Sequence, residues 1–140
     1  MRIMCLDVGK ARVGIAQSDP MQIIASPLEV LKRTNSINND AKYVVNLINQ
    51  NNVELLVIGL PLKLDGTESE STIMAKEFAE KIAKFSGVKI EFQDERLSTV
   101  SAERILLEGN VRREKRKGVV DKIAATIILQ NYLDRLAYKK

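Results

Sequence analysis

The chain has 140 residues, of which 45% are hydrophobic and 29% are charged, and its net charge is +4. These values are typical of one soluble globular domain over residues 1–140, and the mild basic excess permits an anionic partner. The chain has no histidine, which excludes histidine general bases, Ser–His and Cys–His nucleophile pairs, and zinc sites built on imidazole.

The first third of the chain predicts three strands. Residues 2–8 are an almost continuous apolar run, as expected for a strand that is covered on both faces. Residues 12–18 predict a second strand, which the turn signal Asp19-Pro20 ends. Residues 23–31 predict a third strand, and Pro27 indicates that it lies at a sheet edge. Short connections favour an antiparallel meander.

The remainder of the chain alternates between helical and strand patterns. In chain order we expect a helix over residues 36–51, a strand over 54–60, a loop over 61–68, a helix over 70–86, a strand over 88–93, a short helix between Thr99 and Gly109, and a last helix from about 119 to 137. Helices between the fourth and fifth strands imply parallel pairing there. The predicted fold is a three-layer α/β domain around a five-stranded mixed sheet.

The cysteine count and the hydropathy of the chain indicate the cellular compartment in which the protein is expected. The single cysteine, Cys5, allows no internal disulfide, and its place in the first apolar run predicts a small core residue. No apolar run approaches the ~20 residues of a membrane span. Asp7 falls where a signal peptide would need its apolar core. We therefore expect the protein in the cytoplasm.

Three acidic residues stand in marked positions far apart in the sequence. Asp7 ends the first apolar run, Glu95 follows the fifth predicted strand, and Asp121 opens an apolar helical stretch. Converging carboxylates would repel one another unless a cation neutralised them, and oxygen ligands suit Mg²⁺ or Mn²⁺. The pattern predicts a divalent metal site beside a phosphate.

Each acid also has a structural alternative. Asp7 could accept turn amides at Gly9, and Glu95 could pair with Arg96 at the surface. Asp121 could cap the last helix, because aspartate is favoured at that position. If it is already helical, it shares the inward face of the residues three, four and seven positions further on. Spacing alone leaves both readings of Asp121 open.

Basic residues lie near two of these acids. Lys10 and Arg12 belong to the turn beside Asp7, where they could hold a phosphate. A basic run precedes the last helix and comprises Arg112, Arg113, Lys115, Arg116 and Lys117. Such residues give salt-dependent, largely sequence-independent binding to a nucleic-acid backbone, although basic runs are often solvated loops. Because few aromatic residues are available for stacking, a structured duplex or junction fits better than a single strand.

Four motifs, in order, carry a resemblance to a known family. They are Leu6-Asp7-Val8-Gly9 with Val13-Gly14-Ile15-Ala16, Ile58-Gly59-Leu60-Pro61 with Asp65-Gly66-Thr67, Asp94-Glu95-Arg96-Leu97-Ser98-Thr99, and Val120-Asp121-Lys122-Ile123-Ala124-Ala125. Together they span essentially the whole chain and strongly resemble the YqgF family. This family comprises bacterial Holliday junction resolvases that are also described as nucleases maturing the small-subunit ribosomal RNA precursor.

The resemblance implies an RNase H-like fold and a metal-dependent endonuclease. Its expected substrate is the 5′ end of the 16S rRNA precursor in ribosome biogenesis, and the alternative is a Holliday junction in recombination and repair. Asp7, Glu95 and Asp121 would be the catalytic residues and the ligands of two Mg²⁺ or Mn²⁺ ions, about 3.5–4 Å apart. Asp94 could support them or cap the next turn.

The chain departs from the family pattern in two places. The family often has a Thr-Lys pair after the first glycine, whereas here Gly9 is followed by Lys10-Ala11-Arg12. Many related nucleases also place a metal-binding acid after the fourth strand. Here that strand ends in Gly59-Leu60-Pro61, so Glu95 would substitute.

Two other function classes remain open from the sequence. The spacing of Asp7, Gly9 and Gly14 resembles the first phosphate loop of actin-like and Hsp70-like ATPases, but those enzymes close two domains around ATP. A non-catalytic nucleic-acid binder would keep the fold without the activity. A junction resolvase predicts a two-fold homodimer, because it cuts two symmetric strands, whereas an RNA-trimming enzyme has no such need.

Overall fold

The computed structural model describes residues 1–61, 65–94 and 113–139, and of residues 113–122 and 139 it describes the backbone alone. The elements, in chain order, are β1 (Arg2–Val8), β2 (Arg12–Ser18), β3 (Ala25–Lys32), α1 (Ile37–Gln50), β4 (Val53–Leu60), α2 (Glu70–Phe85), β5 (Lys89–Asp94) and α4 (Arg113–Lys139). From β1 to β5, each boundary lies within two residues of its predicted position.

The five strands form one sheet in the order β3-β2-β1-β4-β5. The first three strands pair antiparallel, and β4 pairs parallel with both β1 and β5. The predicted mixed sheet is thereby confirmed, and so is the edge position of β3. Pro27 lies in that edge strand, opposite Ala16, where the register shifts. A proline is tolerated there because an edge strand has no second neighbour that needs its amide.

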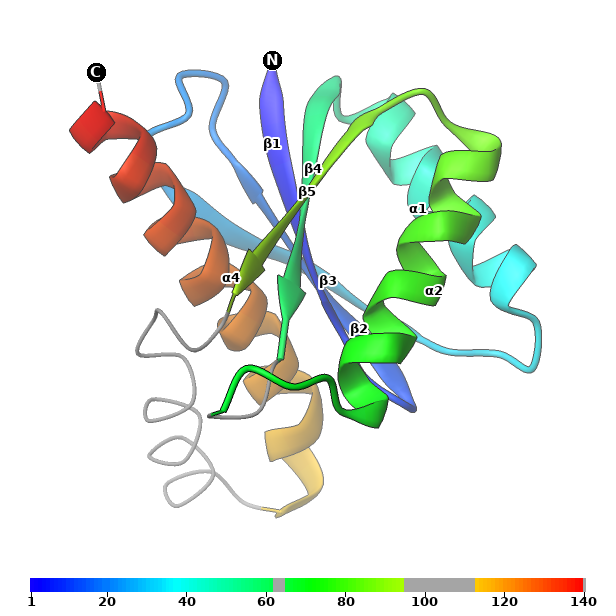
Figure 1. Ribbon diagram of the computed structural model, residues 1–140. Coiled ribbons are helices and arrows are strands. Elements are labelled where there is room, and N and C mark those ends of the chain that lie inside the picture. The colour runs from blue at the N-terminus through cyan, green and yellow to red at the C-terminus, as the bar shows by residue number, and fades with distance from the viewer. Residues whose placement is uncertain (62–64, 95–112, 140) are drawn as a thin grey trace.

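Helices cover both faces of the sheet: α1 and α2 lie on one side and α4 lies on the other (Figure 1). Alternate residues of β1 serve the two cores, because successive strand side chains point to opposite faces. Met4 and Leu6 pack with Phe78 of α2. Ile3 and Cys5 pack with the α4 side, and Cys5 is fully buried. The central strand is therefore covered on both faces, as its sequence predicted.

The last helix begins earlier than the sequence indicated. It starts at Arg113 and not near residue 119, so the basic residues from 113 to 117 belong to its first turns. Arginine, lysine and glutamate are good helix formers, and a glycine inside a helix costs only about 1 kcal/mol relative to alanine. Gly118 is therefore tolerated within α4. The short helix predicted between Thr99 and Gly109 lies outside the described residues.

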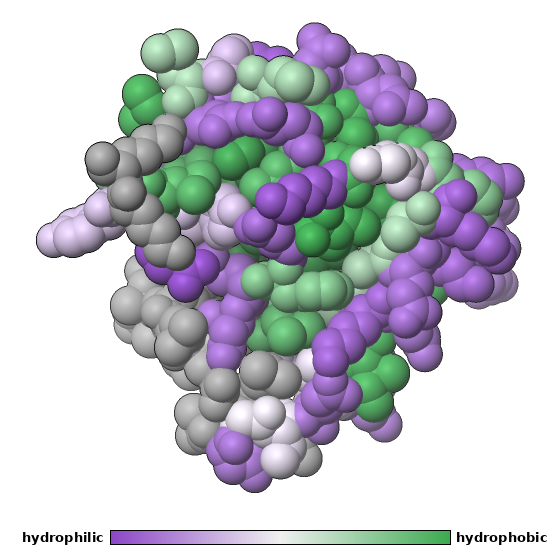
Figure 2. Space-filling model, turned by 45° about the horizontal axis from the view of Figure 1, so that its top comes forward, coloured by the Kyte–Doolittle hydropathy of each residue, from purple (hydrophilic) through white to green (hydrophobic). Residues whose placement is uncertain are grey.

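Figure 2 views the molecule from above the N-terminal end of β1 and shows hydrophobic side chains in the middle of this face. Hydrophilic side chains frame them on several sides. Exposed hydrophobic residues in the described chain include Met21, Ile23 and Ile24 between β2 and β3, and Phe92 on the edge strand β5. Within the described chain, no helix combines the length and the hydropathy that crossing a membrane would need.

Candidate functional site

Asp7 lies next to the last residue of the central strand β1, and only 9% of it is exposed. It has the same strand parity as Ile3 and Cys5, which pack toward α4. Its register partner on β2 is Gly14. On the other side, Gly59 follows Ile58, which pairs with Leu6, so Gly59 is the neighbour of Asp7 on β4. The carboxylate therefore has a residue without a side chain on each side.

The turn after Asp7 is closed by its own backbone. The Gly9 amide donates a 2.8 Å hydrogen bond to the Arg12 carbonyl. A Cβ at position 9 would lie 2.9 Å from that same carbonyl oxygen, closer than real Cβ atoms approach. The turn needs glycine here because of this close approach. The Gly9 amide also has a backbone acceptor, so it does not depend on the Asp7 carboxylate.

The predicted phosphate-holding residues lie at the tip and at the end of this turn. Lys10 is exposed, and its ammonium lies 3.6 Å from the carboxylate of Glu70 at the start of α2. Arg12 begins β2 and is half-buried. Both basic residues therefore belong to the turn and strand start that directly follow the end of β1. The structure also pairs Lys10 with a carboxylate that sequence reasoning did not identify.

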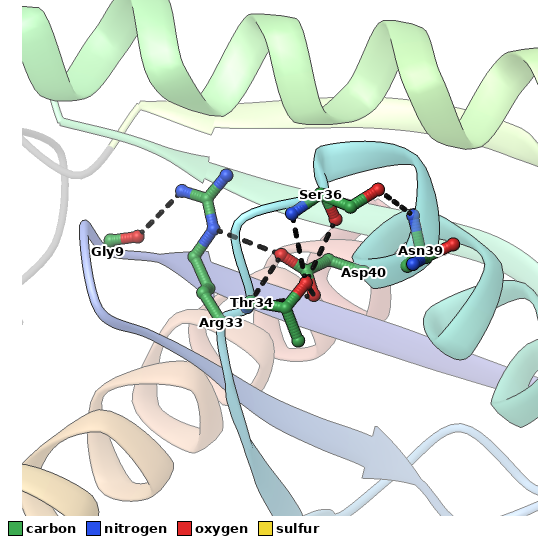
Figure 3. Close-up of polar contacts among 6 residues, drawn as sticks. All are labelled: Gly9, Arg33, Thr34, Ser36, Asn39 and Asp40. Atoms are coloured by element: carbon green, nitrogen blue, oxygen red, sulfur yellow. Dashed lines mark hydrogen bonds and ion pairs between the residues drawn. The ribbon is translucent and has the colours of Figure 1, made fainter.

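A polar cluster beneath the turn is the main feature that the sequence did not reveal (Figure 3). The Arg33 guanidinium donates a 3.0 Å hydrogen bond to the Gly9 carbonyl and lies 3.8 Å from the Asp40 carboxylate. Asp40 is 1% exposed and also accepts from the Thr34 backbone amide and hydroxyl. Asp40 lies in the first turn of α1, where an acid is usually explained by the helix dipole.

A second polar network joins β5 to α4. The Gln93 amide donates to the Ile128 carbonyl at 3.0 Å, and its oxygen accepts from Arg135 at 2.6 Å. The Tyr132 hydroxyl donates to Glu91. Burial, followed by this hydrogen bond, raises the pKa of Tyr132 to about 12. These contacts fix the strand that precedes Glu95 against the helix that contains Asp121. A buried glutamine in a strand is the one sequence signal that could have indicated them.

Asp121 lies inside α4, eight residues after Arg113, so the alternative reading of Asp121 as the N-cap of this helix is wrong. The earlier start of the helix explains the error. Residues 124, 125 and 128, which follow Asp121 at helical spacing, are buried against the sheet. The side chain of Asp121 lies outside the description, as does all of Glu95.

The predicted basic residues of the C-terminal third are only partly described. Arg112 lies outside the described residues. Arg113, Lys115, Arg116 and Lys117 are described by their backbone, in the first turns of α4. Their assignment to nucleic-acid binding therefore stays a prediction.

The donor set can be tested against a divalent metal by its chemistry and by the sheet topology. Because β1, β4 and β5 are parallel, their C-terminal ends lie together at one end of the sheet, across the strand tips. Asp7 and the half-buried Asp94 both lie at this end. Within the described part, no three acidic or cysteine residues form a metal-binding group. Carboxylate oxygens are the donors that Mg²⁺ and Mn²⁺ prefer, so the chemistry of Asp7 and Asp94 suits such an ion, while the described residues alone do not complete its site.

Comparison with known proteins gives matches over nearly the whole chain. The family model described as "RuvX: Holliday junction resolvase" matches residues 1–135. A relative from Carboxydothermus hydrogenoformans is 42% identical over 134 residues, which are 96% of each chain. A relative from Clostridium perfringens is 44% identical over 137 residues, covering 98% of this chain and 99% of the relative. Both relatives carry the name "Putative pre-16S rRNA nuclease".

Among solved structures, Thermus thermophilus RuvC in complex with a Holliday junction substrate is similar, with a TM-score of 0.60. The alignment covers 98% of this chain and 96% of RuvC, at 12% identity. A second structure of Thermus thermophilus RuvC gives a TM-score of 0.59 at 14% identity. These similarities confirm the RNase H-like fold that the sequence motifs predicted.

Proposed function

The chain belongs to the RuvX family of Holliday junction resolvases, which confirms the resemblance of its motifs to YqgF, and on this premise we propose that it is a metal-dependent endonuclease. It hydrolyses phosphodiester bonds in structured nucleic acid in the cytoplasm. Its substrate is the 16S rRNA precursor, which is cut at the 5′ end during ribosome biogenesis. The names of two relatives more than 40% identical to the chain support this choice of substrate.

The observation that carries the proposal is the setting of Asp7. It is an acidic residue at the end of the central strand, 9% exposed, with Gly14 on one side and Gly59 on the other. A carboxylate taken out of water is costly unless a cation or hydrogen bonds compensate it. The two glycines place no side chain of their own beside this carboxylate.

Asp7, Glu95 and Asp121 would hold the Mg²⁺ or Mn²⁺ ions. When bound, two such ions activate a water molecule near neutral pH and stabilise charge on the attacking and leaving oxygens. The chain's own contribution is to place these oxygen donors and to bind the nucleic-acid backbone. Since the chain has no histidine, carboxylates are its best candidates for ligands and proton acceptors.

Binding of the nucleic-acid backbone is assigned to the basic residues at the same end of the sheet as Asp7. Lys10 and Arg12 flank the turn that follows Asp7. Arg112 directly precedes α4, and the basic residues up to Lys117 lie in its first turns. A helix N-terminus favours anions, because its amides are unpaired and its dipole is positive there. Basic side chains at a helix N-terminus lie near its positive dipole end, and a bound phosphate backbone would offset this repulsion.

Holliday junction resolution is the second candidate, because the matching family model carries that description. Symmetric cleavage of a junction would require a two-fold homodimer. A non-catalytic nucleic-acid binder is the third, and it predicts binding that persists in EDTA without cleavage of any substrate.

One experiment separates these candidates. Purified protein is incubated with a 16S rRNA precursor and with a four-way DNA junction, in parallel, with Mn²⁺ and with EDTA. The proposal predicts Mn²⁺-dependent cutting of the precursor near its mature 5′ end and little cutting of the junction. Paired cuts in the junction by a dimer would favour the second candidate. Binding without cleavage of either substrate would refute the nuclease assignment.

A further inference from the structure

Arg33 directly follows β3, yet it contacts the β1–β2 turn through both its backbone and its side chain. Its backbone amide donates to the Ala11 carbonyl at 2.8 Å. Its guanidinium donates to the Gly9 carbonyl at 3.0 Å (Figure 3). These two acceptors lie two residues apart in the turn that leads from Asp7 to Arg12. A single residue therefore holds the turn at two points.

The guanidinium is itself fixed from the other side. Its Nε lies 3.8 Å from the Asp40 carboxylate, and the two side chains are 13% and 1% exposed. Asp40 is held in turn by the Thr34 hydroxyl at 2.9 Å. The guanidinium also lies over the ring of Phe78, 5.4 Å from its centroid, and Phe78 is fully buried. Arg33 thus links the turn to α1 and α2 and has little freedom to move.

The buried Arg33–Asp40 ion pair is poorly explained by a contribution to folding stability alone. Burying two charges costs desolvation that their attraction only partly offsets, and apolar residues of similar volume often do as well. A planar guanidinium, however, can donate to a carboxylate and a carbonyl at the same time with fixed geometry. Arg33 is suited to setting the position of the Gly9 carbonyl relative to α1.

Apart from Arg33 and the pairing of its flanking strands, the turn has one further side-chain contact in the part of the chain that the structure describes, and it is an exposed ion pair. Its tip residue Lys10 is 79% exposed, and the partner of Lys10, Glu70, is 87% exposed. Exposed ion pairs of this kind contribute little. The turn closes on itself through the Gly9 amide and the Arg12 carbonyl, but that bond does not fix it against the rest of the molecule.

We propose that Arg33 is a positioning residue of the nuclease site: its guanidinium, held by Asp40 and Phe78, fixes the Gly9 carbonyl and with it the turn from Asp7 to Arg12. Arg33 acts through this turn and does not touch the substrate. The inference rests on the proposed function and adds to it a residue outside the four family motifs.

The test compares Arg33→Met, Arg33→Lys and a control, Lys42→Met. Lys42 also lies over an aromatic ring, that of Phe85 at 5.1 Å, but it is exposed and has no contact with the turn among those described. Cleavage of the 16S rRNA precursor is measured with Mn²⁺ to obtain kcat and KM. Amide hydrogen exchange is measured at Gly9, and urea unfolding gives the folded fraction of each variant.

Arg33→Met is expected to lower kcat about 10- to 100-fold, since a displacement of about 1 Å from the reactive geometry can cost about 100-fold. KM should change by a smaller factor than kcat, because loosening the turn shifts only Lys10 and Arg12, whereas the basic residues in the first turns of α4 are left unchanged. Exchange at the Gly9 amide should accelerate, while exchange at buried α1 amides such as Val44 stays unchanged. Arg33→Lys should recover part of kcat, because lysine keeps the charge but cannot bridge Asp40 and Gly9.

The outcomes are distinguishable. If the wild type cleaves and folded Arg33→Met cleaves with the same kcat, the inference is overturned and the nuclease assignment stands. If kcat falls only in proportion to the folded fraction, Arg33 is merely structural and the inference also fails. If Arg33→Met does not fold, Arg33→Lys decides by the same criteria. If the wild type cleaves nothing, the proposed function fails and takes this inference with it.

Discussion

Asp7 and Gly14 face each other across the antiparallel pair of β1 and β2. The acid at the end of the central strand therefore has a cross-strand neighbour without a side chain. Cross-strand Cβ atoms lie about 4.5–5.5 Å apart, so a branched residue at position 14 would place its side chain directly beside the carboxylate.

The first prediction concerns this pair. Gly14→Val should lower cleavage by at least about tenfold, because its methyl groups would occupy the space beside Asp7, and misplacing a reactive group by about 1 Å can cost about 100-fold. Cleavage of the 16S rRNA precursor with Mn²⁺ measures the effect. Gly87→Ala is the matched control, since no atom lies within 4 Å of a Cβ at that position. Full activity of Gly14→Val would show that the space beside Asp7 is not used.

Gly9→Ala should destabilise the fold by about 1–3 kcal/mol, the usual cost of forcing atoms into occupied space. Its Cβ would lie 2.9 Å from the Arg12 carbonyl, which already accepts from the Gly9 amide. Urea unfolding measures the change. Gly87→Ala, in open space, should stay within about 0.5 kcal/mol of the wild type. Equal stability of the two variants would mean that the turn can relax.

Glu70→Gln should strengthen nucleic-acid binding about two- to threefold, because it releases Lys10 from its carboxylate partner. Stability should change by less than about 1 kcal/mol, as expected for an exposed ion pair. Binding to the precursor is titrated at several salt concentrations. Lys10→Gln should weaken binding and reduce the salt slope by about one. Glu68→Gln is the control, because the ion pair that the described residues give Glu68 is with Lys76 and not with the turn. Unchanged binding affinity of Glu70→Gln would show that Lys10 does not take part in nucleic-acid binding.

The raised pKa of Tyr132 predicts a loss of folding stability at high pH. Its pKa is raised from 10.0 to about 12, chiefly by burial and then by its hydrogen bond to Glu91. The folded state therefore keeps its proton where the unfolded state loses it. This contribution is complete below pH 10, falls between pH 10 and 12, and is gone above the folded pKa. Between pH 9 and 11 the wild type should lose about 1 kcal/mol more than Tyr132→Phe in urea unfolding.

The other titrating tyrosine with a raised pKa, Tyr43, does not affect that comparison. Hydrogen bonding to Glu29 also raises the pKa of Tyr43, but Tyr43 is present in both proteins and its effect cancels. Parallel pH profiles of the wild type and Tyr132→Phe would show that Tyr132 ionises equally in both states.

Most of the fold could be predicted because its signals are local. The continuous apolar run of β1 reflects helices on both of its faces, and Pro27 marks an edge strand. The start of α4 could not be predicted in the same way. Its first turns are a basic run followed by Gly118, which looks like a boundary although each residue is compatible with a helix. That error also produced the incorrect N-cap reading of Asp121.

The candidate site was predicted only in part, because some of it depends on tertiary pairing. The position of Asp7 at the end of the central strand could be predicted from the sequence, while its role stays a prediction. Arg33 and Asp40 are seven residues apart, and nothing in their local sequence shows that both lie beneath the turn of Gly9. Gln93 likewise acquires its role only when α4 packs over β5. Glu95 lies outside the described residues, so its role stays a prediction.

Cleavage of the 16S rRNA precursor by Asp7→Asn, with Mn²⁺, tests the central claim most directly. Asparagine keeps the shape of the side chain and removes the charge that the ion requires. The exposed Asp134 offers a matched control in Asp134→Asn. The account predicts that Asp7→Asn remains folded and loses more than about 100-fold in rate, since losing even a supporting group of a metal site costs about 10- to 100-fold. Cleavage by folded Asp7→Asn at the wild-type rate would contradict it.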